Sequence, residues 1–141
     1  MESLKEARAL GAIVLMLALA GAHADDTVLV SGPGVEYWTP TFRAQPDYPR
    51  SAALRGTVGC AVVQFVVEAD GRTSSHRVLF SEPPKVFDRE AVDALKRWRF
   101  EPGPDNPDGQ AALLTQTLNF ELVGRERVRC TTADAAATDV Q

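Results

Sequence analysis

The sequence predicts a small two-layer α+β domain, in which two helices pack on one face of a three-stranded sheet. Three observations predict it: an amphipathic stretch at 86–102, two strand-like runs joined by Asp70-Gly71, and a run of alternating character at 113–123. With a short helix at 49–55, the element order is helix, strand, strand, helix, strand. A helix and a sheet each have an apolar face to bury, so packing them together gives a single core.

The first 24 residues have the pattern of a secretory signal peptide. Basic residues precede an unbroken apolar run at 9–20, and Ala22-His23-Ala24 is a small-residue cleavage pattern. The apolar run is shorter than the roughly 20 residues that a membrane-spanning helix needs. We therefore expect export, with cleavage before Asp25.

Composition narrows the classes of partner. The 141 residues carry a net charge of −4, which argues against nucleic acid as the partner. The chain is long enough for one small domain with a modest core.

Cys60 and Cys130 form an even pair in an exported chain and predict a disulfide, with two reduced thiols as the alternative.

Residues 25–45 form an N-terminal extension whose apolar residues follow neither a helical nor a strand periodicity. The extension is rich in aromatic residues for a linker. The short helix follows at 49–55. Pro49 suits the first position of that helix, and Gly56 suits the position just past its end.

The two runs at 57–68 and 72–81 predict an antiparallel hairpin, because Asp-Gly between strand-like runs is a strong turn signal. Alternation places His76, Val78 and Phe80 on one face of the returning strand. We expect the first strand to lie in the middle of the sheet and the third strand to lie on an edge.

The first strand carries apolar residues on both faces. Phe65, the largest, indicates the face that meets the helices, which leaves Val62 and Val66 on the other face. An open face of an antiparallel sheet normally carries polar residues. We therefore expect a cover over Val62 and Val66, supplied by the aromatic part of the extension or by a second copy of the chain. The aromatic residues of the extension are Tyr37, Trp38 and Phe42.

The stretch at 86–102 predicts one amphipathic helix. Asp88 is a residue type that caps helix N-termini, and Pro102 prevents continuation. Leu95 and Trp98 recur on one helical face, so we expect Trp98 and the nearby Phe100 to belong to the core rather than to a ligand platform.

The run at 113–123 alternates between apolar and polar residues, which predicts a half-buried strand. We expect the charged residues at 125–129 to prolong it. The tail from Thr131, rich in Ala, Thr and Asp, is expected to be disordered.

The sequence contains no pattern that indicates catalysis, a metal or a cofactor. His76 is the only histidine after residue 24, and a lone strand histidine is usually structural. Ser74 and Ser75 beside it do not lie at a strand-to-helix turn of the kind that presents a nucleophile. We therefore expect neither enzymatic activity nor a small-molecule substrate.

Five short motifs occur in the same order as the predicted elements. They are Asp47-Tyr48-Pro49, Asp70-Gly71, Phe87-Asp88-Arg89-Glu90, Trp98-Arg99-Phe100-Glu101-Pro102-Gly103 and Asn119-Phe120-Glu121-Leu122. Together they resemble the C-terminal domain of the TonB family of energy transducers. The resemblance covers a TonB-like domain at 46–124, which follows the signal peptide at 1–24 and the extension at 25–45 and precedes a strand extension with a tail at 125–141.

The resemblance implies the fold already predicted and a binding role in the periplasm. Family members hold a short extended peptide of outer-membrane transporters, the TonB box, by adding it to the edge third strand. The edge residues implied here are Leu118, Asn119, Phe120, Glu121, Leu122 and Val123. The motif residues implied for the core are Tyr48, Pro49, Phe87, Leu95, Trp98 and Phe100.

Two features depart from a full transducer. The N-terminal apolar segment carries a cleavage pattern instead of a retained membrane helix, and the spacer before the domain is only 25–45. An alternative function is therefore a structural or assembly subunit of a cell-envelope complex. Such a subunit would use the same edge strand without energy transduction, and self-pairing there would give a homodimer.

Cleavage of the signal peptide makes a direct prediction about the N-terminus. N-terminal sequencing of the protein from the periplasmic fraction should read Asp25-Asp26-Thr27. A protein that keeps Met1 and sediments with the inner membrane would contradict it.

Overall fold

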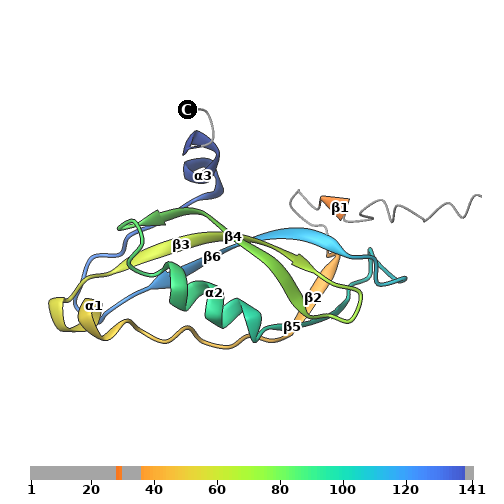
Figure 1. Ribbon diagram of the computed structural model, residues 1–141, viewed down its shortest axis with the longest axis horizontal. Helices are drawn as coiled ribbons and strands as arrows, with labels where there is room; N and C mark the ends of the chain where they lie inside the picture. The colour runs from red at the N-terminus through yellow and green to blue at the C-terminus, as the bar shows by residue number, and fades with distance from the viewer. Residues whose placement is uncertain (1–27, 30–35, 139–141) are drawn as a thin grey trace, which may run out of the picture.

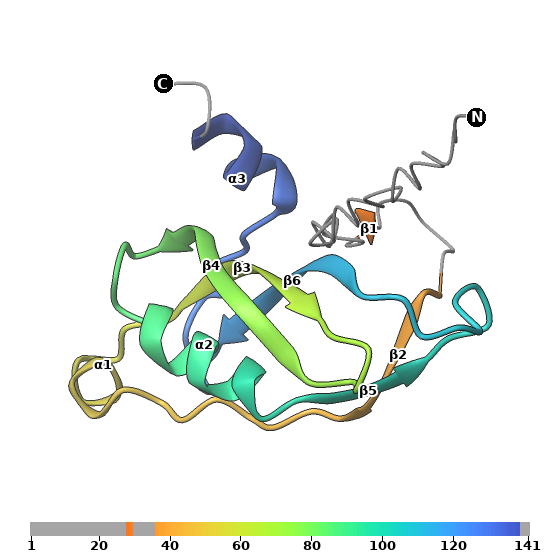
Figure 2. The same cartoon turned by 45° about the vertical axis from the view of Figure 1, so that its right-hand side comes forward.

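The computed structural model describes residues 28–29 and 36–138, which form the two-layer α+β arrangement that the sequence predicts (Figure 1). Helices α1 (Arg50–Arg55) and α2 (Asp88–Lys96) contribute to the same core on one side of the sheet. A further helix, α3 (Thr132–Thr138), lies on the opposite side of the sheet from α2 (Figure 2). Among the helices described, none is both long enough and apolar enough to cross a membrane.

The main sheet has β3 (Gly59–Val67) in its middle, as predicted for the first strand of the hairpin. Strands β4 (Thr73–Glu82) and β6 (Ala112–Phe120) pair antiparallel with its two sides. A short strand, β1 (Val28–Leu29), pairs parallel with the first residues of β6. The strand order is therefore β1-β6-β3-β4.

Register shifts between β3 and β4 decide which face the β4 side chains occupy. Phe80 is paired with Val62 and Val78 with Val63, which leaves Leu79 as an extra residue in β4. Val78 therefore packs against the helix-side core, whereas Phe80 packs on the other face. The prediction that Phe80 shares a face with Val78 is wrong, because simple alternation assumes an unbroken ladder.

Helix α2 begins and ends at residues other than those predicted. Phe87 is the N-cap residue, and Asp88, which was expected to cap the helix, is its first residue, with a buried Oδ1 atom that has no hydrogen-bond partner among the described residues. The Phe87 carbonyl accepts the N–H of Ala91 at 3.0 Å, so the helix starts where the buried Phe87 ring is anchored. The helix ends at Lys96, and Trp98 lies beyond it.

A second sheet of two antiparallel strands was not indicated by the sequence pattern. It pairs β2 (Trp38–Phe42) with β5 (Arg99–Pro102), which follows α2 almost at once. Trp98 and Phe100 are buried in the main cluster. The same pairing brings Trp38 into the helix-side core, where it is 5% exposed.

The sheet face away from α2 is covered by the C-terminal segment. Cys60 and Val62 of β3 are fully buried and pack in one cluster with Cys130 and Ala135. A disulfide joins Cys60 to Cys130, with their Cα atoms 5.9 Å apart, which confirms the predicted bridge. The expectation that the aromatic extension covers this face is wrong, because Trp38 packs on the opposite face.

Helix α3 is present where a disordered tail was expected. The segment 121–131 contains no strand, so the expectation that residues 125–129 prolong the third strand is wrong. Thr131 and Asp134 cap the helix reciprocally: the N–H and the hydroxyl of Thr131 donate to Asp134 Oδ2 at 2.7 and 2.8 Å, and the Asp134 N–H donates to the Thr131 hydroxyl at 3.3 Å. The hydrogen bonds from the Thr131 N–H and hydroxyl lower the pKa of the Asp134 carboxyl. A short alanine-rich segment thus becomes helical because it is capped at its start and Ala135 docks on the sheet.

The disulfide should contribute measurably to stability, because it closes a loop across 70 residues. Replacing both cysteines (Cys60→Ser with Cys130→Ser) is expected to lower the free energy of unfolding by about 2–4 kcal/mol, measured by urea denaturation. Wild-type protein reduced with dithiothreitol serves as the matched control and should lose a similar amount. An unchanged urea midpoint in both samples would show that the bridge carries no stability.

Candidate functional site

The outer edge of β6 is open over most of its length. On its inner side β6 pairs with β3 from Ala112 to Phe120 without a register shift. On its outer side the described residues supply only β1, which reaches Ala112 and Leu113. The backbone groups on the outer side of 114–120 are therefore available to another extended chain.

The other edge of the sheet, along β4, is less suited to strand addition. Its ladder with β3 is interrupted at two places, one of which leaves Leu79 extra. Near the second interruption Ser75 has a positive φ of 50°. Such bulges twist an edge out of the flat geometry that a further strand needs. The regular β6 edge is the better template.

A groove borders the β6 edge on the helix side. It has a volume of about 200 Å³ and is lined by Thr117–Asn119 of β6, the segment 43–46 and Trp98. The Trp98 indole N–H donates to the carbonyl of Ala44 at 3.0 Å. The Arg43 guanidinium lies 5.4 Å from the centre of the Trp98 ring, so it stacks on the ring as a cation–π pair.

A second groove borders the same edge on the far face. It has a volume of about 410 Å³ and lies between Thr117, Asn119 and the segment 127–131, which the disulfide at Cys130 holds against the sheet. Arg127 in its wall forms an ion pair with Glu121 at 3.3 Å. The walls of the two grooves therefore carry more basic than acidic side chains in a chain of net charge −4.

The edge and its two grooves can receive one extended strand. Successive side chains of a strand point to opposite faces of the sheet, so alternate side chains would enter the two grooves in turn. The Thr117 carbonyl accepts a hydrogen bond from the Gln116 side-chain amide at 3.1 Å, so we expect it to face the outer side, where an added strand would replace this bond. Because alternate residues of a strand direct their backbone groups to the same side, we expect the N–H of Asn119 to face outward too.

The structure divides the edge residues that the resemblance implied into two groups. Leu118, Asn119 and Phe120 belong to β6, whereas Glu121, Leu122 and Val123 lie beyond its end. After Phe120 the chain turns, with the N–H of Arg125 donating to the Leu122 carbonyl at 3.2 Å. The strand thus ends earlier than predicted, because the chain turns away toward Cys130 once the Phe120 ring is anchored. Residues 114–117 also belong to the open edge, which the alternating pattern from 113 could have indicated.

His76 is a structural residue. Its Nε2 atom lies 2.8 Å from the Thr73 hydroxyl, and its ring stacks on Phe65 with the ring centres 6.2 Å apart. Burial, and to a lesser extent the positive charge of Lys96, lowers the pKa of His76. Residues 28–29 and 36–138 contain no cluster of His, Cys, Asp or Glu that could hold a metal ion.

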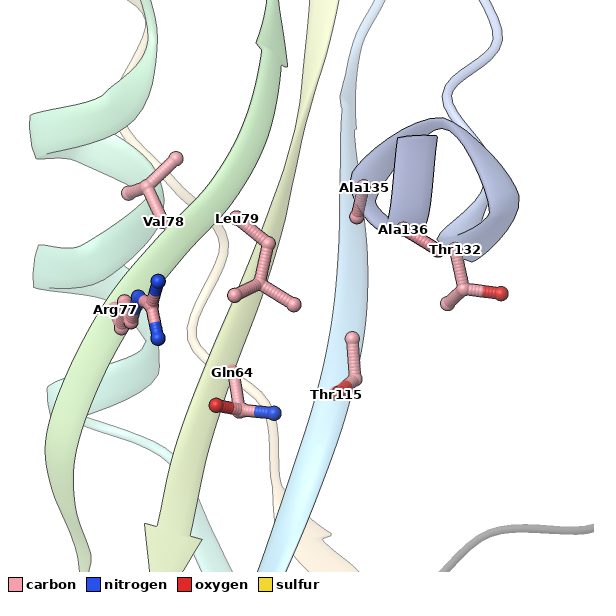
Figure 3. A pocket seen from close by; sticks show the side chains of 8 residues that line it. All are labelled: Gln64, Arg77, Val78, Leu79, Thr115, Thr132, Ala135 and Ala136. Carbon is pink, nitrogen blue, oxygen red and sulfur yellow. The ribbon is translucent and has the colours of Figure 1, made fainter. Parts of the chain in front are cut away.

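A further groove of about 400 Å³ lies between α3 and the far face of the sheet (Figure 3). Its walls come from β3, β4, β6 and α3. The residues that line it are Gln64, Arg77, Val78, Leu79, Thr115, Thr132, Ala135 and Ala136. Figure 3 shows no convergence of polar groups on one point, so this groove lacks the features of a specific small-molecule site.

Comparison with known families matches residues 44–122 to the family described as the Gram-negative bacterial TonB protein C-terminal domain. The TonB protein of Pseudomonas aeruginosa is 47% identical over 80 residues, which cover 57% of this chain and 23% of that protein. The TonB protein of Escherichia coli K12 is 38% identical over 77 residues, which cover 55% of this chain and 30% of that protein. The chain thus matches about a quarter to a third of the length of these relatives.

A solved structure shares the fold. The solution NMR structure of the Pseudomonas aeruginosa TonB C-terminal domain superposes with a TM-score of 0.54 at 33% sequence identity. The match covers 68% of this chain and 97% of that domain. This chain therefore shares its fold with the C-terminal domain of a TonB relative.

The position at which β6 ends can be tested by a pair of truncations. Phe120→Ala should lower the free energy of unfolding by about 3–5 kcal/mol, because the ring is buried. Val123→Ala should change it by less than about 0.5 kcal/mol, because Val123 is fully exposed. Urea denaturation of the two variants measures both values. A large loss of stability for Val123→Ala would contradict an end of β6 at Phe120 and would support a strand that extends to Val123.

Proposed function

Because this chain belongs to the family of Gram-negative bacterial TonB C-terminal domains, we propose that it binds an extended peptide of an outer-membrane transporter by strand addition. The peptide would be the TonB box, added to the outer side of β6. The observation that carries the proposal is the open edge at 114–120, bordered by a groove on each face. The family is non-enzymatic, in agreement with the expected lack of catalysis.

Backbone pairing would supply most of the affinity. The ladder between β3 and β6 has no register shift, so β6 offers regularly spaced donors and acceptors on its outer side. The grooves would supply selectivity through alternate side chains of the peptide. The stacked Arg43 on one face and the Arg127 segment on the other favour a peptide that is not basic.

The place of action would be the periplasm, where a cleaved exported domain meets the periplasmic ends of outer-membrane transporters. The role would be in TonB-dependent transport. The family match at 44–122 supports this role in transport.

Isothermal titration calorimetry with a synthetic TonB-box peptide tests the proposal. Asn119→Pro removes an outward N–H of the edge and should weaken binding by about tenfold or more, because a ladder hydrogen bond and its neighbours are lost. Asn119→Ala keeps the backbone donor and removes only the side chain that lines the two grooves, so it is the matched control and is expected to bind more tightly than Asn119→Pro.

Circular dichroism and urea denaturation should show that both Asn119 variants are folded. A proline variant that is folded and binds with unchanged affinity would rule out the β6 edge. Sedimentation analysis in the same samples addresses the alternative role in assembly: a dimer that the proline substitution dissociates, without peptide binding by the wild type, would favour it.

A further inference from the structure

One wall of the groove on the far face of β6 comes from residues beyond the family match. The match ends at Leu122, whereas this groove of about 410 Å³, the far-face groove, is walled by the segment 127–131. The segment belongs to what we call the C-terminal arm, residues 121–138, which runs from the end of β6 through α3. The arm therefore lies beyond the shared region, yet it borders the edge that is proposed to bind the peptide.

The arm is anchored at a defined position along β6. Cys130 is bonded to Cys60, and Cys60 pairs with Asn119 in the ladder between β3 and β6. Val128 packs in the same far-face cluster as this bridge. Arg129 lies between these two anchored residues, so contacts that do not involve its own side chain place it beside the end of the open edge.

The charges of the far-face groove leave one basic side chain without a partner among the described residues. Arg127 and Glu121, which both line the groove, form an ion pair at 3.3 Å and offset each other. Arg129 also lines the groove and is exposed, and its guanidinium makes no ion pair or hydrogen bond with any other described residue. The other lining residues are uncharged, so the groove carries an excess positive charge.

We propose that the C-terminal arm is a specificity element of the strand-binding edge, in which Arg129 receives an acidic side chain of the bound strand. The inference rests on the proposed function, because it concerns the peptide bound along β6. A strand added to 114–120 directs every second side chain to the far face, where Thr117 and Asn119 line the groove. A carboxylate in that position accepts charge-assisted hydrogen bonds from the guanidinium.

The groove on the helix side of the edge does not offer the same partner. Its basic residue, Arg43, is already stacked on the Trp98 ring, 5.4 Å from the ring centre. Arg129 has no such contact among the described residues. The two faces therefore differ in their preference, and the preference for an acidic residue alternates along the bound peptide with the period of two that a strand imposes.

The test uses the full chain and a synthetic TonB-box peptide in which glutamate replaces one residue at a time, each peptide with a glutamine twin. Isothermal titration calorimetry at low salt gives the ratio of the two Kd values at each position. The glutamate peptide should bind wild-type protein about threefold more tightly than its twin at the positions that face the arm, the gain expected of a well-placed exposed ion pair. At the positions between them the twins should bind equally.

Two variants separate Arg129 from the overall charge of the protein. Arg129→Gln should bring the ratio close to one at the positions that face the arm. Arg89→Gln is the matched control: it removes the same charge from an exposed side chain on α2, which lies on the opposite side of the sheet from α3, and it should keep the wild-type ratio (Figure 2).

The double variant Cys60→Ser with Cys130→Ser tests the anchoring of the arm. Release of the arm should lower the ratio toward one in samples that circular dichroism shows to be folded. A general loss of stability weakens both peptides of a pair alike, so the ratio responds to the position of the arm and not to stability alone.

Two results would overturn the inference while leaving the proposed function intact: peptides that bind with a ratio near one at every position, or a ratio that Arg129→Gln does not change. Absence of binding by every peptide to the wild type would refute the proposed function, and this inference with it.

Discussion

A cluster of three aromatic rings joins the segment before α1, the segment before α2 and the end of β6. Phe87 and Phe120 stack with their ring centres 4.3 Å apart, and Tyr48 meets both edge-on at 5.5 and 5.9 Å. The Tyr48 hydroxyl donates to the Thr57 carbonyl at 2.6 Å, so its polar end is satisfied, and burial raises its pKa. A Cβ at Gly59 would collide with the Phe87 ring, which explains why β3 begins with glycine.

This ring cluster also determines where the binding edge ends. Phe120 is the last residue of β6, and its ring is fixed by contacts to segments that precede α1 and α2. The chain that follows is free to turn back across the far face, where the disulfide at Cys130 anchors it. Anchoring on both sides leaves the outer side of β6 straight and exposed between two walls, the geometry that strand addition requires.

The two faces of the sheet are covered by opposite ends of the described chain. On the helix side, Trp38 and the strand β2 fill the space beside Trp98 and Phe100. On the far side, α3 and its reciprocal Thr131–Asp134 cap cover Val62 and Phe80. The edge thus lies where the N-terminal and C-terminal segments approach β6 from either face, and both segments can influence what binds there.

Local signals in the sequence were enough to establish the core elements. Asp70-Gly71 specified the hairpin, because a tight turn needs the positive φ of 80° that Gly71 adopts. The alternation of 113–123 specified a half-buried strand, and the even pair of cysteines in a chain with an export signal predicted the bridge between Cys60 and Cys130. The short motifs then led to the fold, because their order matched the order of the elements.

Tertiary contacts decided the rest, for identifiable physical reasons. The β4 bulge at Leu79 depends on the fit between two strands, which alternation in one strand cannot express. Helix α2 stops at Lys96 because β5 gains backbone pairing with β2, a partner far away in the sequence. The open edge itself is a property of the assembled sheet, because nothing local to 114–120 distinguishes a strand with one neighbour from a strand with two. Only the topology shows that, among the described residues, no strand pairs with the outer side of 114–120.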